Sequence, residues 1–334
     1  MNELAGHQLY PWQQAVWARF APVLRGERAG HALLLTGAPG IGKRHLAGVI
    51  LRALLCEQAD ASRLPCGQCR ACIQVAAGSH PDHSRLEPPE PGKTIGVDAV
   101  REFCRRLYTT PQFAGGRIGL IDPADRLTVQ AANSLLKALE EPPASSRILL
   151  ITDRRDRVLP TIRSRCQMWR VDRPDPAGVA DWLASMPAAV ADAMPLARHA
   201  PLQALTLAES PVATEQGTLF EGLANLLAAR RDPVSIAAEW QKAEPGWVVD
   251  WLYRVVADLL KLTSGAPDNT LVFRDRAREL RRMAELLDGQ ALRRLPPTLT
   301  HTRRLLEASV DRQLTLESLA IAFLDCRRRE KRAA

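Results

Sequence analysis

Apolar residues form two kinds of pattern in the first half of the chain. Short runs that are continuously apolar, as expected for strands buried on both faces of a sheet, are separated by segments with helical spacing. The runs cover residues 31–37, 117–122 and 147–153, and the helical segments cover residues 45–55, 97–108 and 129–141. This alternation predicts a parallel α/β sheet whose strands are joined by crossover helices.

The alternation ends near Val171, and the later segments have the spacing of helices. The Asp-Arg-Pro-Asp-Pro stretch at 172–176 has the composition of a linker, and Pro211 marks a second boundary. The pattern therefore predicts an α/β region at 1–172, a small helical domain at 173–210 and a larger helical domain at 211–334. The predicted helices are 177–186, 203–209, 217–230, 247–262, 273–287, 299–306 and 314–329.

Composition places the chain among soluble globular proteins. Of its 334 residues, 46% are hydrophobic and 25% are charged. We find no signal peptide and no apolar run of about 18 residues, so no membrane association is expected. Seven cysteines, an odd number without a secretion signal, favour the reducing cytoplasm over a disulfide framework. The formal net charge of +8 is compatible with a polyanionic partner but does not establish one.

A glycine-rich turn, Gly37-Ala-Pro-Gly40-Ile-Gly42-Lys43-Arg44, follows the first predicted strand. In a phosphate loop, glycines let backbone N–H groups face the phosphates at a helix N-terminus, and the lysine contacts the outer phosphates. The next residue is Ser or Thr, whose hydroxyl binds Mg²⁺. Arg44 stands there and brings a positive charge instead. The turn indicates phosphate-loop ancestry and argues against hydrolysis, and a vestigial loop kept for its turn is the alternative.

The second predicted strand ends in Ile121-Asp122-Pro123. At this place phosphate-loop ATPases carry an aspartate that helps to hold Mg²⁺, followed by a glutamate that polarises the attacking water. Asp122 could still help to hold Mg²⁺, but Pro123 has no acid–base capacity and cannot polarise water. Two separate catalytic positions are therefore changed, which one accidental substitution does not explain.

Four cysteines have the spacing C-x9-C-x2-C-x2-C in a Gly-containing segment. Four thiolates can surround one Zn²⁺ tetrahedrally and leave no open position for water, so we expect a structural zinc module at about 56–83. An iron–sulfur cluster is the main alternative, but its cysteine run continues downstream, where residues 73–103 contain no cysteine. A redox dithiol is a weaker alternative. The expected ligands are Cys56, Cys66, Cys69 and Cys72.

Three stretches resemble bacterial clamp-loader ATPases of the AAA+ class. They are Ile95-Gly-Val-Asp-Ala-Val-Arg-Glu102, Ala131-Ala-Asn-Ser-Leu-Leu-Lys-Ala-Leu-Glu-Glu-Pro-Pro143 and Ser164-Arg165-Cys166. Four thiols inserted after the phosphate-loop helix fit the same family. The resemblance is dense over residues 9–172 and implies a RecA-like AAA+ P-loop domain with a zinc module, a helical lid domain and a C-terminal helical collar domain.

Within that family, the departures resemble a stationary subunit more closely than the gamma/tau motor subunit. The motor carries Thr or Ser at Arg44, Asp-Glu at Asp122-Pro123, and a sensor-2 Arg where ungapped matching places Leu202. Thr152 falls at the sensor-1 position. The resemblance thus implies a degenerate nucleotide site at which ATP hydrolysis is not expected, formed by Gly37, Gly40, Gly42, Lys43, Asp122 and Thr152.

The resemblance also implies a role for Arg165. In the family, the arginine of Ser-Arg-Cys reaches across the subunit boundary to the γ-phosphate of an adjacent motor subunit, as an arginine finger in trans. It implies gamma/tau and delta clamp-loader subunits as partners in a hetero-pentameric ring. The sliding clamp and primed DNA would be contacted through that ring, within the DNA polymerase III holoenzyme. A surface salt bridge is the structural alternative for Arg165.

Two other functions compete with this one. A catalytically active ATPase of the gamma/tau type requires Mg²⁺ held without Ser or Thr and catalysis without a glutamate at 123. A zinc-stabilised nucleic-acid-binding adaptor is suggested by the net charge and by the basic run at 327–332. Hydrolysis by the isolated chain would favour the first, and salt-dependent DNA binding by the lone chain would favour the second.

Overall fold

The computed structural model describes residues 8–24, 30–58, 64–90, 92–143, 145–209, 212–243, 245–306 and 310–328. The chain divides into two compact units, residues 1–205 and 206–334. The first contains the sheet, two short helices after it and the start of a third, so the predicted domain boundary at 172 stays a prediction. No helix in the described part of the chain combines the length and apolar character that a membrane span requires.

The first unit is built on a five-stranded parallel sheet in the order β2-β3-β4-β1-β5. The three strands predicted from apolar runs are confirmed and lie together at its centre as β3, β4 and β1. Leu34 pairs in register with Leu150, and Ile121 pairs with the same residue from the other side. The strands are β1 Ala32–Thr36, β2 His83–Leu86, β3 Arg117–Ile121, β4 Ser146–Thr152 and β5 Gln167–Arg170.

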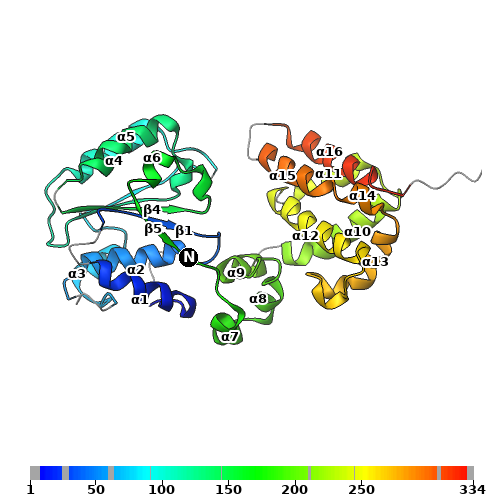
Figure 1. The fold of residues 1–334 in the computed structure, drawn as a ribbon, viewed down its shortest axis with the longest axis horizontal. Coiled ribbons are helices and arrows are strands. Elements are labelled where there is room, and N and C mark those ends of the chain that lie inside the picture. The colour runs from blue at the N-terminus through cyan, green and yellow to red at the C-terminus, as the bar shows by residue number, and fades with distance from the viewer. Residues whose placement is uncertain are drawn as a thin grey trace, which may run out of the picture. The chain divides into compact units, whose positions relative to one another are not determined.

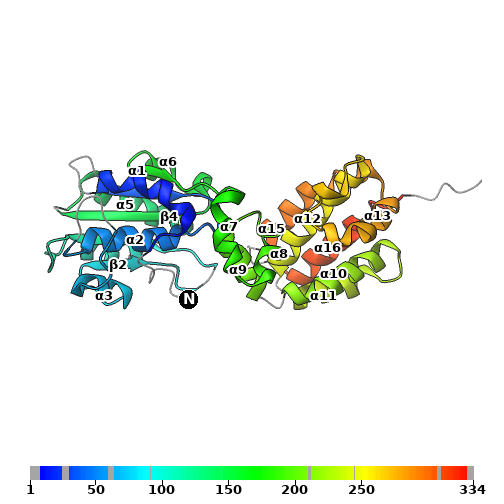
Figure 2. The same ribbon diagram turned by 90° about the horizontal axis from the view of Figure 1, so that it is seen from below.

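Both faces of this sheet are covered by helices, which explains why its central strands are apolar throughout. Leu33 and Leu35 of β1 face a core shared with α1 and α2, whereas Leu34 faces a core shared with α4 and α5. Figures 1 and 2 show α1, α2 and α3 on one side of the sheet and α4, α5 and α6 on the other. The helices are α1 Gln14–Leu24, α2 Lys43–Leu55, α3 Arg70–Ala76, α4 Val97–Leu107, α5 Val129–Glu140 and α6 Pro160–Arg163.

The edge strands β2 and β5 were not predicted. β5 reads Gln-Met-Trp-Arg and is largely exposed, and β2 reads His-Ser-Arg-Leu with alternating burial. Neither presents a continuous apolar run, because an edge strand keeps one side open to solvent. Three short helices follow the sheet: α7 Pro176–Ala184, α8 Ala188–Ala193 and α9 Pro201–Glu209.

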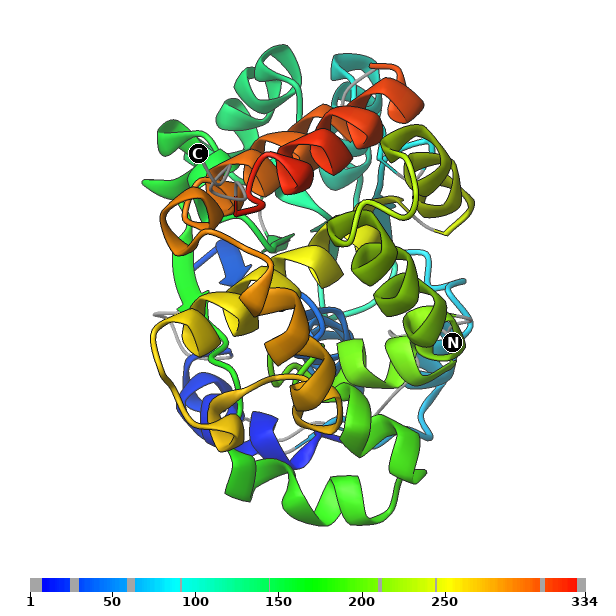
Figure 3. The same cartoon turned by 90° about the vertical axis from the view of Figure 1, so that its right-hand side faces the viewer.

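The second unit is helical, as predicted. Its longest helix is α12, which packs against α13 and α15, while α16 packs against α11 and α15 (Figure 3). Trp251, Leu252 and Val255 of α12 are fully buried in this bundle. The helices are α10 Val212–Leu227, α11 Pro233–Lys242, α12 Pro245–Thr263, α13 Ala277–Glu285, α14 Gly289–Leu292, α15 Leu295–Leu306 and α16 Arg312–Leu324.

One buried carboxylate in the bundle has a structural task. Asp258 of α12 is fully buried and accepts hydrogen bonds from the backbone N–H groups of Val272 and Phe273 at 2.8 and 3.0 Å. Lys261 Nζ also donates to it at 2.9 Å. The charge is thus matched, and the loop before α13 is fixed to α12.

Candidate functional site: a degenerate phosphate loop, a surface arginine and four thiols

The phosphate loop joins β1 to α2, where the sequence placed it. Gly40 and Gly42 have φ angles of 72° and 87°, in the left-handed region that favours glycine. A Cβ on Gly40 would lie 2.8 Å from the backbone nitrogen of Gln203 at the start of α9. A Cβ on Gly37 would lie 2.3 Å from the carbonyl oxygen of Val171. The glycines therefore serve both the turn and the close approach of neighbouring backbone.

Groups from two distant segments bind the carbonyl oxygens of this loop. Trp12 Nε1 donates to Ile41 at 3.0 Å, and Gln13 Nε2 donates to Gly42 at 2.8 Å. The Leu202 N–H donates to the Gly40 carbonyl at 2.9 Å. Leu202 thus lies against the phosphate loop, where the sequence matching placed it, and it offers a backbone amide and an alkyl chain.

The side chain of Lys43 is bound by two groups of its own chain. Its side chain is 4% exposed, and its ammonium donates to the Ala38 carbonyl at 2.5 Å and forms an ion pair with Asp153 at 2.5 Å. Burial lowers the pKa of Lys43, and the Asp153 carboxylate opposes that shift. A phosphate group would have to displace this carboxylate to reach the ammonium.

Arg44 occupies the position of the missing hydroxyl and pairs with the strand-end aspartate. Its Nε donates to Asp122 Oδ2 at 2.7 Å, and Arg85 lies 3.6 Å from the same oxygen. Asp122 is almost fully buried, so its charge needs a partner. In a working ATPase this carboxylate helps to hold Mg²⁺, whereas here guanidinium groups supply the positive charge. Pro123, joined to Asp122 by a cis peptide bond, offers no carboxylate.

Thr152, the sensor-1 candidate, is fully buried at the end of β4. Its hydroxyl donates to Asp125 at 2.5 Å and accepts from the Arg154 N–H at 2.9 Å. The Thr152 hydroxyl is therefore hydrogen-bonded to Asp125, and the next residue, Asp153, forms the ion pair with Lys43.

Three participants were missed by sequence reasoning: Asp153, Arg85 and Gln13. A signal did exist for Asp153. β1 and β4 are adjacent parallel strands with Thr36 opposite Thr152, so a carboxylate just after β4 lies at the same sheet edge as the phosphate loop. Arg85 and Gln13 carry no comparable signal, because β2 was not predicted and Gln13 belongs to a separate turn.

Arg165 lies at the surface, two residues after α6. Its Nε donates to Glu140 Oε1 at 2.8 Å, and its NH2 group forms an ion pair with the same carboxylate. Its NH1 group donates to the Thr161 carbonyl at 3.0 Å. The side chain is 34% exposed. A forked cation is therefore available at the surface, at present bound to a carboxylate of its own chain.

The four predicted zinc ligands converge on one point, with all four sulfur atoms within 4.8 Å of one another. Cys56 Sγ lies 3.5 Å from Cys66 and 3.9 Å from Cys69, and Cys66 Sγ lies 4.0 Å from Cys72. A tetrahedron with Zn–S bonds of about 2.3 Å has edges of about 3.8 Å, so the cluster has the size that zinc requires.

The surroundings of these thiols also suit a bound cation. The Cys69 N–H points to Cys66 Sγ at 3.3 Å, and the Cys72 N–H points to Cys69 Sγ at 3.4 Å. Burial opposes ionisation of Cys66, but backbone N–H groups outweigh it and lower its pKa to about 7. Burial raises the pKa of Cys72. A zinc ion would stabilise all four as thiolates. His80 is not part of the cluster, and its Nδ1 accepts from the Asp82 N–H.

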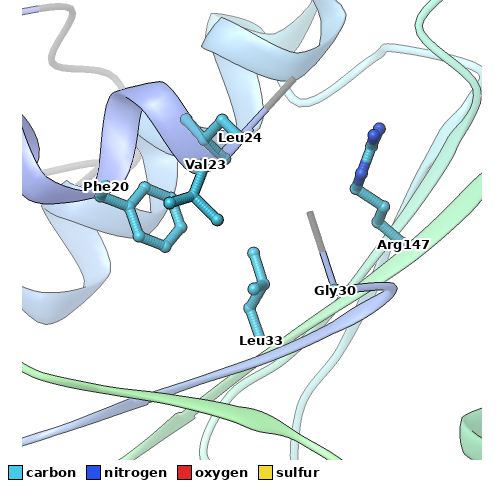
Figure 4. A pocket seen from close by; sticks show the side chains of 6 residues that line it. All are labelled: Phe20, Val23, Leu24, Gly30, Leu33 and Arg147. Atoms are coloured by element: carbon cyan, nitrogen blue, oxygen red, sulfur yellow. The ribbon is translucent and has the colours of Figure 1, made fainter. Parts of the chain in front are cut away.

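Two pockets of the first unit lie apart from the phosphate loop and Arg165, although Cys56 of the thiol cluster is among the residues that line the second. One, between α1 and the sheet, has Arg147 as its one ionisable lining residue (Figure 4). The other has a volume of about 330 Å³ and lies at the end of α2, with Glu57 and Arg147 among mainly apolar neighbours. Neither collects the groups that phosphate chemistry needs. The first is lined by Phe20, Val23, Leu24, Gly30, Leu33 and Arg147.

Two family models match this chain. The one described as DNA polymerase III, delta subunit, matches residues 12–175. The one described as DNA polymerase III, delta subunit, C terminal, matches residues 214–324. Together they span the sheet and most of the helical unit.

Individual relatives agree with these matches. The DNA polymerase III subunit delta' of Pseudomonas aeruginosa is 34% identical over 322 residues, which are 94% of this chain and 97% of the relative. That of Escherichia coli is 34% identical over 268 residues, 79% of each chain. The gamma/tau subunit of Mycobacterium tuberculosis is 36% identical over 155 residues, which are 46% of this chain and 26% of that protein. The chain belongs to the family of DNA polymerase III delta' subunits.

Proposed function

We propose that this chain is a stationary subunit of the clamp loader of DNA polymerase III. It helps to place the sliding clamp on primed DNA, hydrolyses no ATP itself, and donates Arg165 to the ATP site of a neighbouring subunit. Family membership supports the clamp-loader role. The ion pair between Arg44 and Asp122 is the observation that carries the non-hydrolysing part, because it fills the place of the catalytic metal.

The loss of hydrolysis follows from three neighbouring features. Arg44 neutralises the carboxylate that would hold Mg²⁺, Pro123 removes the residue that would polarise water, and Asp153 occupies Lys43. Catalysis of phosphoryl transfer depends on positioning and on positive charge that can stabilise the transferring group. Here the positive charges are already matched within the chain.

In this role, Arg165 is the residue that the chain contributes to the ATP site of its neighbour. A guanidinium is always charged and presents a rigid fork of donors, which suits the oxygens of a phosphate in transfer. Such a residue supplied in trans accelerates phosphoryl transfer by about 10³–10⁵ in GTPases. Arg165 is exposed enough to reach another subunit once it leaves Glu140.

The partners follow from this role. We assign gamma/tau-type and delta-type subunits as ring neighbours in a hetero-pentamer, with the sliding clamp and primed DNA contacted through the assembly. Zinc has a structural task at Cys56, Cys66, Cys69 and Cys72, since four protein ligands leave no place for a reacting water.

The test is reconstitution of the complete loader with Arg165→Ala. DNA-stimulated ATP hydrolysis and clamp loading are expected to fall several-fold, because one motor site loses its finger. Arg165→Lys is expected to rescue little, since lysine keeps the charge but lacks the fork. Arg155→Ala is the matched control, being an exposed arginine of the same segment. Unchanged rates for both reactions with Arg165→Ala would refute the assignment.

A further inference from the structure

The guanidinium of Arg165 is fully engaged within its own chain. One edge, made of Nε and NH2, faces the Glu140 carboxylate. NH1 donates to the Thr161 carbonyl and lies 3.4 Å from Ser164 Oγ. Nε and NH2 both approach the same oxygen, Oε1 of Glu140. This edge of a guanidinium is also the one that binds a phosphate bidentately, so it cannot serve both anions at once.

The position of Glu140 in its helix does not stabilise the negative charge of its carboxylate. It is the last residue of α5, and the partial negative charge at a helix C-terminus disfavours a carboxylate. Its interaction with Arg165 across 25 residues of sequence offsets that disadvantage. Both side chains are partly exposed, at 34% for Arg165 and 49% for Glu140, so the pair is a weak surface contact that a competing anion can open.

We propose that Glu140 is a positioning residue for the arginine finger: it holds Arg165 in a stored orientation until a phosphate of a neighbouring subunit replaces its carboxylate. The proposal rests on the role of Arg165 proposed above. Exchange of the Glu140 carboxylate for a phosphate leaves the positive charge of Arg165 matched throughout. It also ties release of Arg165 to the arrival of a nucleotide-bearing neighbour.

The experiment uses the reconstituted loader with Glu140→Gln, which keeps the shape of the side chain and removes its charge. ATP hydrolysis without DNA is expected to rise about two- to fivefold, the range that a weak surface ion pair corresponds to. The rate with saturating primed DNA is expected to stay unchanged, because Glu140 is then already displaced. Glu141→Gln is the matched control, as the adjacent exposed carboxylate, and is expected to change neither rate.

Two further readouts separate storage from a general structural effect. In the isolated subunit, phenylglyoxal is expected to modify Arg165 two- to fivefold faster in Glu140→Gln, as followed by peptide mass spectrometry, with Arg155 as the internal reference. In the loader, the double variant with Arg165→Ala is expected to match Arg165→Ala alone, because Glu140 acts through Arg165.

The outcomes divide cleanly. DNA-independent hydrolysis that is unchanged or lowered in Glu140→Gln, or an unchanged rate of Arg165 modification, overturns the stored orientation. If Arg165→Ala alone has no effect, the finger itself fails, and that failure is visible independently of Glu140.

Discussion

Lys43 and Arg44 are each held by a carboxylate of their own chain. Asp153 pairs with Lys43 and Asp122 pairs with Arg44, so the two side chains that a phosphate loop would offer to nucleotide and metal have internal partners. Arg165 differs in its setting, since both side chains of its pair with Glu140 are partly exposed, whereas Lys43 and Asp122 are buried in the other two pairs. At the residue scale, the chain keeps its phosphate-loop charges occupied and leaves its surface arginine exchangeable.

His45, in the first turn of α2, gives the first unit a pH dependence. Its Nδ1 lies 3.0 Å from Gln13 Oε1, and its ring lies against Tyr10. Burial lowers the pKa of His45 to about 4, with a smaller contribution from Arg52. The unfolded imidazole titrates near 6.5, so between pH 6.5 and pH 4 the unfolded state binds more protons. Stability is therefore present above about pH 6.5 and is lost as pH falls towards 4.

The corresponding prediction concerns His45→Gln. His45 is expected to account for a loss of about 2 kcal/mol in the free energy of unfolding between pH 7 and pH 5. The variant should show a loss smaller by that amount in urea titrations at the two pH values. His301→Gln, at an exposed position, is the control and should behave as the parent does. An equal loss in the parent and in His45→Gln would contradict the assignment.

The four-thiol cluster joins two helices of the first unit. Cys56 lies just after α2, Cys69 and Cys72 lie at the start of α3, and α3 has only seven residues. A helix that short is not stable alone, and a metal ion shared by the four thiols would give it a fixed anchor on α2. The module also packs against Phe113, whose ring contacts His80 and lies under Arg70.

The prediction for this element is metal dependence of folding. The purified chain is expected to carry one zinc ion, and Cys72→Ser is expected to lose it along with several kcal/mol of stability. Metal analysis and thermal unfolding measure the two effects. Cys104→Ser, a thiol outside the cluster, should keep both zinc and stability. Iron in place of zinc, or full stability in metal-free Cys72→Ser, would speak against a structural zinc site.

At the scale of the whole molecule, the two units divide the work. The first carries the phosphate loop, the thiols and Arg165, and the second is a helical bundle stabilised by α12 and its buried Trp251. In the proposed role, the chain gives Arg165 to a neighbour and keeps its own phosphate loop occupied, so it would have no complete ATP site by itself. Its activity is therefore expected to appear only in the assembly.

This leads to a prediction for the isolated chain. With ATP and Mg²⁺ it is expected to show no hydrolysis above that of Lys43→Ala, measured as phosphate release. The Lys43→Ala protein serves as the baseline for contaminating ATPases. Turnover by the parent that this substitution abolishes would favour an active gamma/tau-type ATPase in place of the stationary subunit.

Features that reside in consecutive residues could be predicted from the sequence alone. Three central strands were predicted because strands buried on both faces are apolar throughout, as in Ala32–Thr36. The changes at Arg44 and Pro123, and the four thiols, were readable because motif spacing is a local property. The four thiols lie together in the structure, in a cluster of the size that zinc needs.

Which charged side chains pair with one another depends on how the chain folds. Arg44 and Asp122 are 78 residues apart, and Arg165 and Glu140 are 25 apart, so spacing in the chain gives no hint of either pair. Strand order sets the first pair, by bringing the end of β3 to the phosphate loop. The packing of α6 on α5 sets the second. The edge strands β2 and β5 could not be predicted from the sequence either. They are strands because of the strands they pair with, and not because of their own apolar content.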